Sequence, residues 1–247
     1  MLGLTSVTFR NKSCEEIIAL AKERGLECIE WGGDVHVPVN QLDHALKVGE
    51  MTRRAGLKVL SYGSYFRPGE GANFQDIINT ALALGAKTVR VWTPWLDSER
   101  ISDEDFFKMA DELRSAAVLA EKAGLIVATE FHNGTYSDTA EHCLRLIKAV
   151  NRSNFKTYWQ PLYGAERNLL DIAKLVDRIE NVHVYNWIYG KEITRKLLSE
   201  NEKDWEQYVK LLKDKNFLLE FVKEDSEENF EKDVICLKEI VRRVKNA

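Results

Sequence analysis

The sequence predicts a single (β/α)8 barrel, a TIM barrel that spans residues 1–247 as one domain. Apolar runs typical of strands alternate eight times with longer segments of helical periodicity. The runs begin near Leu2, Leu26, Leu57, Lys87, Leu125, Phe155, Asn181 and Asn216. Eight strands alternating with eight helices in about 250 residues fit a closed parallel barrel. An open doubly wound sheet is the alternative, but no glycine-rich phosphate loop follows the first strand.

The boundaries of the helices carry their own signals. The helical segments are expected to begin near Ser13, Gln41, Asn73, Asp103, Asp138, Asn168, Asp204 and Glu227. Four of these residues are candidate N-caps, because a side-chain oxygen can accept a free N–H of the first turn: Ser13, Asn73, Asp103 and Asp138. Glycine stands where a helix stops and a strand begins, and it adopts the left-handed conformation without a Cβ penalty: Gly25, Gly56, Gly85 and Gly124.

The composition narrows the class of protein. Hydrophobic residues make up 45% and charged residues 30%, as in ordinary globular proteins. The apolar runs are too short to span a membrane and no signal pattern opens the chain, so we expect a cytoplasmic protein. The cysteines are scattered, which suits free thiols. Net charge is −4 with basic and acidic residues interleaved, so no nucleic-acid partner is expected. A homo-oligomer stays open.

The stretch 125–134 is the centre of the functional interpretation. An apolar run leads to Glu130, then to His132, and opens into an Asn-Gly turn. Side chains two apart on a strand share a face, so Glu130 and His132 point the same way. A buried carboxylate without a partner costs several kcal/mol, so a cation or donor should lie near Glu130.

Polar side chains recur at the ends of the other strands. Valine alternates with His183 and Tyr185 on one strand and with Arg90 and Trp92 on another, which turns these four residues inward. Three further strands end in Glu30, Gln160 and Glu220. Barrel enzymes carry their chemistry at the carboxyl ends of the strands.

Four of these inward residues can converge on one metal ion: Glu130, Gln160, His183 and Glu220. Oxygen ligands with one imidazole suit Mn²⁺, Mg²⁺ or Co²⁺ better than a thiolate-binding metal. The competing interpretation is a network of salt bridges among Glu130, Glu220, Arg90 and lysines. His36 lies in a loop that is long enough to fold over a pocket. Tryptophans at strand ends can be core, or apolar walls of a sugar pocket: Trp31, Trp92, Trp95, Trp159 and Trp187.

The sequence resembles the xylose-isomerase-like TIM barrel family of sugar-phosphate isomerases and epimerases. The matching segments are IEWGGDVHVP (29–38), VRVW (89–92), TEFHNG (129–134), YWQP (158–161), NVHVYNW (181–187) and LEFV (219–222). The resemblance implies a divalent metal, with Mn²⁺ first, held by Glu130, Gln160, His183 and Glu220. Gln160 departs from the acid usual in the family, and Asn186 stands where a related Asp often occurs.

The resemblance implies isomerisation or epimerisation of a small sugar or sugar-derived ketose by proton transfer through an enediolate. Such chemistry needs a base, an acid on the opposite side, and a metal that stabilises the enediolate. Glu130 and Glu220 are the expected catalytic pair. The residues expected to bind substrate are Glu30, His36, Arg90, Trp92, His132 and Asn186.

Three alternatives share the barrel. An inosose-type dehydratase would lose water from the same enolate. An abasic-site endonuclease should show more His and acidic ligands and a basic rim, and neither is evident. A sugar-binding barrel without turnover is the non-enzyme alternative, and Gln160 is its best support.

Overall fold

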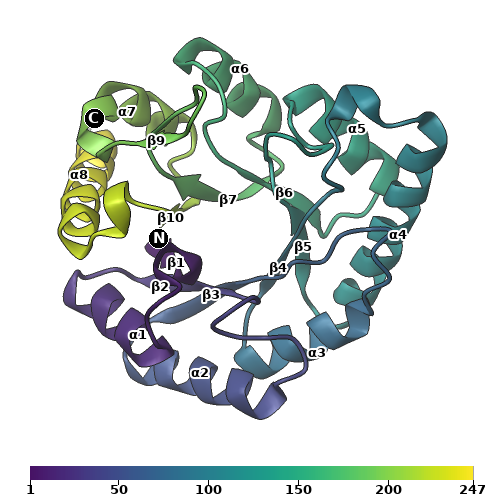
Figure 1. The fold of residues 1–247 in the computed structure, drawn as a ribbon, viewed down its shortest axis with the longest axis horizontal. Coiled ribbons are helices and arrows are strands. Elements are labelled where there is room, and N and C mark those ends of the chain that lie inside the picture. Colours follow the sequence, from purple (N-terminus) through teal and green to yellow (C-terminus); the bar gives the residue numbers. More distant parts are fainter. Residues whose placement is uncertain (247) are drawn as a thin grey trace.

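The computed structural model describes residues 1–246 and contains a closed barrel of eight parallel strands, which confirms the predicted fold class. Figure 1 shows the strands at the centre with the helices in a ring around them. The strands are β1 (Leu2–Thr5), β2 (Cys28–Gly32), β3 (Lys58–Gly63), β4 (Thr88–Val91), β5 (Ile126–Thr129), β6 (Phe155–Trp159), β7 (Ile179–Val184) and β10 (Asn216–Leu219). The barrel closes where β1 pairs with β10, with Leu4 opposite Leu219.

The helices that cover the barrel are α1 (Cys14–Glu23), α2 (Leu42–Arg54), α3 (Phe74–Leu84), α4 (Asp103–Lys122), α5 (Ala140–Val150), α6 (Ala165–Leu175), α7 (Glu202–Leu211) and α8 (Glu227–Asn246). The N-caps Ser13 and Asn73 are confirmed, since each side chain accepts a backbone N–H of the first turn. The other two expected caps are wrong. Ser102 caps α4 and Thr139 caps α5, each one residue from the acid that we expected. None of the described helices has the length and apolar character needed to cross a bilayer.

A small hairpin interrupts the regular alternation and was not predicted. Its strands β8 (Trp187–Ile188) and β9 (Thr194–Arg195) pair antiparallel in the connection between β7 and α7. Short 3-10 helices cover Ser6–Phe9, Ser98–Arg100, Leu198–Asn201 and Lys223–Asp225. The hairpin therefore stands at the carboxyl end of β7, on the face where barrels carry their sites.

The helix-to-strand glycines fill the expected role. Gly85 ends α3 with a φ of +85°, a conformation that L side chains rarely adopt. Its N–H donates to the carbonyls of Ala81 and Leu82. This turn directs the chain straight into β4.

Side chains inside the barrel form layers. An inner apolar cluster consists of Cys28, Ala128, Tyr158 and Leu218. Two residues further along the same strands, the next inward positions are all polar and buried: Glu30, Glu130, Gln160 and Glu220. The period of two along a strand thus stacks a polar layer on an apolar plug at the carboxyl end of the barrel.

Candidate active site

A cavity of about 220 Å³ opens above the polar layer. Its lining mixes charged and aromatic side chains: Val7, Arg10, Tyr65, Arg67, Arg90, Trp92, Trp95, Glu130, His132, Gln160, Tyr185, Trp187, Glu220 and Phe221. Concave sites that combine apolar walls with a few convergent polar groups are the usual ligand sites of proteins. This cavity is therefore the candidate active site.

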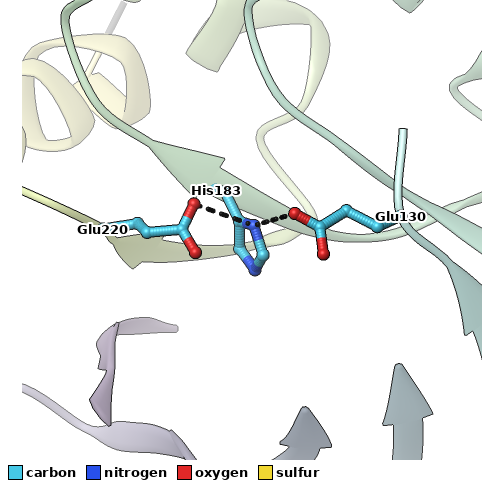
Figure 2. A group of neighbouring side chains, drawn as sticks. All are labelled: Glu130, His183 and Glu220. Atoms are coloured by element: carbon cyan, nitrogen blue, oxygen red, sulfur yellow. Dashed lines mark ion pairs between the residues drawn. The ribbon is translucent and has the colours of Figure 1, made fainter. Parts of the chain in front are cut away.

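The imidazole of His183 lies between two carboxylates at the floor of the cavity (Figure 2). Its Nδ1 is 3.2 Å from Oε2 of Glu220 and 3.6 Å from Oε1 of Glu130. The same nitrogen is 3.3 Å from Oε1 of Gln160. Strands β5, β6, β7 and β10 thus bring together the four residues expected to bind metal.

Glu30 lies on the other side of the imidazole. Its Oε1 is 3.4 Å from Nε2 of His183 and 3.2 Å from Nε of Arg90. Its Oε2 accepts hydrogen bonds from the hydroxyls of Ser61, at 2.7 Å, and Tyr158, at 2.6 Å. Glu30 does not line the cavity, so it supports His183 and Arg90 from below and is not placed to touch substrate.

Arg90 is completely buried between two acids. Its guanidinium forms ion pairs with Glu30 and with Glu130. The expected partner of the buried Glu130 is therefore present. Part of the salt-bridge network considered as an alternative exists as well, with Arg90 but no lysine in it. Because two acids already pair with its charge, Arg90 is less available to a substrate than the sequence suggested.

The buried charges at the floor of the cavity shift the pKa values of Glu30, His183 and Glu220. Burial by itself raises the pKa of Glu30, but Arg90 and His183 outweigh it and lower that pKa to about 2. Burial lowers the pKa of His183, but Glu220 and Glu30 outweigh it and raise that pKa to about 9. Glu220 keeps a lowered pKa despite its burial because His183 and Arg90 face it. Perturbed pKa values of this kind are concentrated at functional sites.

The donor set fits a divalent metal ion. One ligand atom from each of Glu130, His183 and Glu220 lies within 4.8 Å of the others. In the neutral tautomer that keeps the proton on Nε2, 3.4 Å from Oε1 of Glu30, the Nδ1 of His183 presents a lone pair toward the same point as the carboxylates and Gln160. Within residues 1–246, Glu130, His183 and Glu220 form the one group of three or more His, Cys, Asp or Glu side chains whose ligand atoms lie close enough together to hold an ion.

One wall of the cavity is aromatic. The ring of His132 packs edge-on against Trp92 and Trp95, with centroids 5.0 Å and 5.5 Å away. Its Nδ1 donates to the carbonyl of Asn133 at 2.6 Å, which leaves Nε2 as an acceptor. Burial lowers the pKa of His132, so the ring is neutral near pH 7. Trp187 contributes a further aromatic side chain to the cavity wall.

The backbone after Glu220 takes a special conformation. Phe221 has a φ of +45°, in the left-handed region that costs a non-glycine residue of order 1 kcal/mol. Its N–H donates to Oγ1 of Thr8 at 3.2 Å, and its carbonyl accepts from Nε1 of Trp187 at 3.2 Å. These contacts hold the turn that sends Glu220 inward and Phe221 to the cavity wall.

Besides Glu30, two more expected substrate-binding residues lie outside the cavity, and we correct all three. His36 is buried beside Trp31, with Nε2 3.0 Å from the carbonyl oxygen of Lys12, and does not line the cavity. Asn186 donates to the carbonyl of Leu197 and faces a neighbouring cavity of about 330 Å³. Both residues hold loops. The two tryptophans Trp31 and Trp159 are fully buried in the core between strands and helices, so they form no cavity wall.

Sequence reasoning missed three residues on the rim, Arg10, Tyr65 and Arg67. They lie in the connections after β1 and β3, where no periodicity marks direction. It also missed Ser61 and Tyr158, which fix Glu30. The alternation of side chains along β3 and β6 was the signal that could have found this last pair.

The chain belongs to the xylose isomerase-like TIM barrel family, whose model matches residues 18–240. This membership agrees with the closed barrel and with the polar layer at its carboxyl end. A search of curated protein sequences finds no match.

Solved structures share the fold across the whole chain. The probable 3-DHS dehydratase AsbF of Bacillus anthracis, involved in petrobactin synthesis, superposes with a TM-score of 0.84 at 17% identity, over 96% of this chain and 98% of that one. L-ribulose 3-epimerase gives 0.74 at 14% identity, over 99% and 97%. The IOLI protein with a bound zinc atom gives 0.71 at 18% identity, over 98% and 97%. At these identities the likeness establishes the fold alone.

Proposed function

We propose that the protein is a divalent-metal-dependent isomerase or epimerase of a small sugar or sugar-derived ketose. The observation that carries the proposal is the convergence of Glu130 and Glu220 on Nδ1 of His183 at the floor of the cavity. Family membership and the likeness to an epimerase barrel support the same reaction class.

Glu130 and Glu220 are the proposed acid and base. They flank His183 from opposite sides (Figure 2). Both line the cavity. One carboxylate would remove the proton from the carbon next to the carbonyl, and the other would return a proton to the enediolate. Return to the same carbon from the other face epimerises it, and return to the neighbouring carbon isomerises the sugar.

Glu130, Gln160, His183 and Glu220 would hold the metal ion. A bound divalent ion supplies an electrophile for the substrate oxygens, which lowers the free energy of the negative charge that proton removal creates. Mn²⁺, Mg²⁺ and Co²⁺ suit the three oxygen ligands best. Zn²⁺ belongs in any comparison, because the IOLI barrel binds it.

Dehydration is the second candidate. It begins with the same proton removal and then expels a hydroxyl group as water. His132 favours it, because its neutral ring could accept the proton from the carbon next to the carbonyl and then deliver that proton to the leaving hydroxyl, which departs as water. The AsbF barrel, a probable dehydratase, supports this candidate too. Isomerisation between two carboxylates does not require His132.

Product analysis on the metal-loaded protein tests the proposal. The protein is incubated with each divalent ion in turn and a panel of ketoses and cyclic polyol ketones, and products are followed by NMR and ultraviolet absorbance. New sugar isomers without loss of mass support the isomerase or epimerase. A conjugated carbonyl with loss of water assigns the dehydratase instead. Binding without any product across the panel would favour a sugar-binding barrel.

A further inference from the structure

One cation in the cavity wall lacks an acidic partner. Within the described residues, the Arg67 guanidinium forms no ion pair, and its Nε is buried without a hydrogen-bond acceptor. The group stacks over Trp92 and Trp95, with Cζ 5.1 Å and 4.7 Å from their ring centroids. Stacking stabilises the cation, but it satisfies none of the N–H donors, because these point outward in the plane of the guanidinium group.

The other two arginines of the cavity are already engaged. Arg10 pairs with Asp34 at 2.7 Å and donates to the Tyr65 hydroxyl at 3.1 Å, and Arg90 pairs with Glu30 and Glu130. Burial by itself would lower the pKa of each of the three arginines. Asp34 outweighs that effect for Arg10 and Glu30 outweighs it for Arg90, whereas the pKa of Arg67 stays lowered. The Nε of Arg90 also lacks a hydrogen-bond acceptor, but it lies 3.2 Å from Oε1 of Glu30. Of the three arginines, Arg67 is therefore the one whose charge no acid among the described residues pairs with.

The charge of the cavity leads to the same residue. At and just below the floor, Glu30 and Glu130 pair with Arg90, and Glu220 lies beside His183 within the field of Arg90. Arg90 together with a divalent ion would balance these three negative charges. At the rim, Asp34 balances Arg10. The charge of Arg67 is then left over, and a buried or half-buried cation is stabilised by an anion that faces it.

The position of Arg67 sets the length of the ligand. Trp92 contacts both guanidinium groups, since Cζ of Arg90 lies 5.3 Å and Cζ of Arg67 5.1 Å from its ring centroid. One indole therefore separates Arg67 from the arginine that pairs with the proposed catalytic Glu130. A molecule of a few carbon atoms can reach from the carboxylates to Arg67.

We propose that Arg67 is an oxyanion subsite and that the substrate is a sugar or polyol derivative bearing a carboxylate or phosphate group at the end remote from the reacting carbon. The inference rests on the proposed function for the identity of the cavity as the reaction site. A guanidinium presents parallel N–H donors that match both oxyanions in a bidentate way. The stacked tryptophans hold its plane fixed for that contact.

Titration with simple anions tests the subsite without any turnover. Tryptophan fluorescence reports on it, because Trp92 and Trp95 contact Arg67. Inorganic phosphate and acetate are added separately, against sodium chloride at equal ionic strength. We expect a saturable change with at least one anion and none with chloride. Arg67→Gln should weaken that binding by about tenfold or more, and Arg67→Lys should lie between, because lysine keeps the charge but loses the planar fork.

Arg100→Gln is the matched control, since it removes one positive charge from an exposed residue of the 3-10 helix Ser98–Arg100, which follows β4 at the same end of the barrel, and this residue does not line the cavity or stack on its aromatic walls. It should bind anions like the wild type. Preference for phosphate assigns a phosphate ester, and preference for acetate assigns a carboxylate. The proposal is overturned if neither anion gives a saturable response, or if Arg67→Gln binds as tightly as the wild type. Because no carbonyl compound is present, either failure leaves the proton-transfer proposal untouched.

Discussion

Glu30 supports His183 from the side opposite the proposed metal. The two side chains meet at 3.4 Å between Oε1 and Nε2, while Nδ1 of the same ring faces Glu220 at 3.2 Å. A carboxylate behind a metal-binding histidine fixes its tautomer and raises its basicity.

Glu30→Gln should therefore weaken metal binding although Glu30 touches no metal. The amide keeps the size of the side chain but removes the negative charge behind the ring. We expect Mn²⁺ affinity to fall by about 10–100-fold in isothermal titration calorimetry. Glu23→Gln, an exposed acid at the end of α1, is the control and should bind normally. Equal affinity in Glu30→Gln would contradict the role assigned to Glu30.

Gln160→Glu should tighten metal binding. The change keeps the length of the side chain and replaces an amide oxygen, 3.3 Å from Nδ1 of His183, by a carboxylate. An added anion among the ligands attracts a divalent cation more strongly. His183→Ala, measured in parallel, should abolish binding. If Gln160→Glu binds the ion no better than the wild type, Gln160 is not a ligand.

Arg90→Gln should destabilise the metal-free protein. The change leaves Glu30 and Glu130 buried without their shared cation. Removing one partner of a buried ion pair costs about 3–5 kcal/mol. Urea unfolding in the presence of a chelator measures this loss. Arg54→Gln serves as the control, because its pair with Glu50 is exposed on α2 and should contribute nothing measurable. A small loss for Arg90→Gln would mean that water reaches the carboxylates.

The layer of polar residues could be predicted because strand geometry makes it visible in the sequence. Alternation with valine marks His183 and Arg90 as inward, and both face the barrel interior in the structure. The sequence has no comparable pattern that tells how deep along the barrel axis an inward side chain will lie. Glu30 is as inward as Glu130, yet it ends below the cavity floor and contacts His183 instead of the cavity.

Loop residues were beyond sequence reasoning for a related reason. Arg67 and His36 both lie in connections between a strand and a helix, where neither a period of two nor of 3.6 assigns a direction. His36 turns to the Lys12 carbonyl and Arg67 turns to the cavity. His36 packs against Trp31 and Arg67 packs against Trp95, and these tertiary contacts cannot be deduced from the sequence.

Asp233 should make stability depend on pH. This buried acid on α8 accepts the N–H of Leu198 at 2.7 Å, and burial raises its pKa to about 6 from 3.8. The folded state thus holds the proton more tightly than the unfolded state, so the contribution of Asp233 is most favourable below about pH 4 and is lost as pH rises toward about 6.

Asp233→Asn carries no charge and should escape that loss. Relative to the wild type, its free energy of unfolding should rise between pH 4 and pH 8 by up to about 3 kcal/mol. Urea unfolding at the two pH values measures the difference. Glu239→Gln, an exposed acid on the same helix, should show no such rise. A constant difference between Asp233→Asn and wild type would contradict a raised pKa.

Solvent hydrogen exchange tests the proposed proton transfer between Glu130 and Glu220 most directly. A converted ketose is incubated in heavy water with the metal-loaded enzyme, and deuterium on the carbon next to the carbonyl is followed by NMR. We expect incorporation in the wild type and in Glu104→Gln, an exposed control on α4. Glu130→Gln and Glu220→Gln should each slow it by about 10²–10⁴-fold or more, because general acid–base catalysis contributes that much. Turnover without deuterium, or near-normal exchange in both variants, would contradict the account.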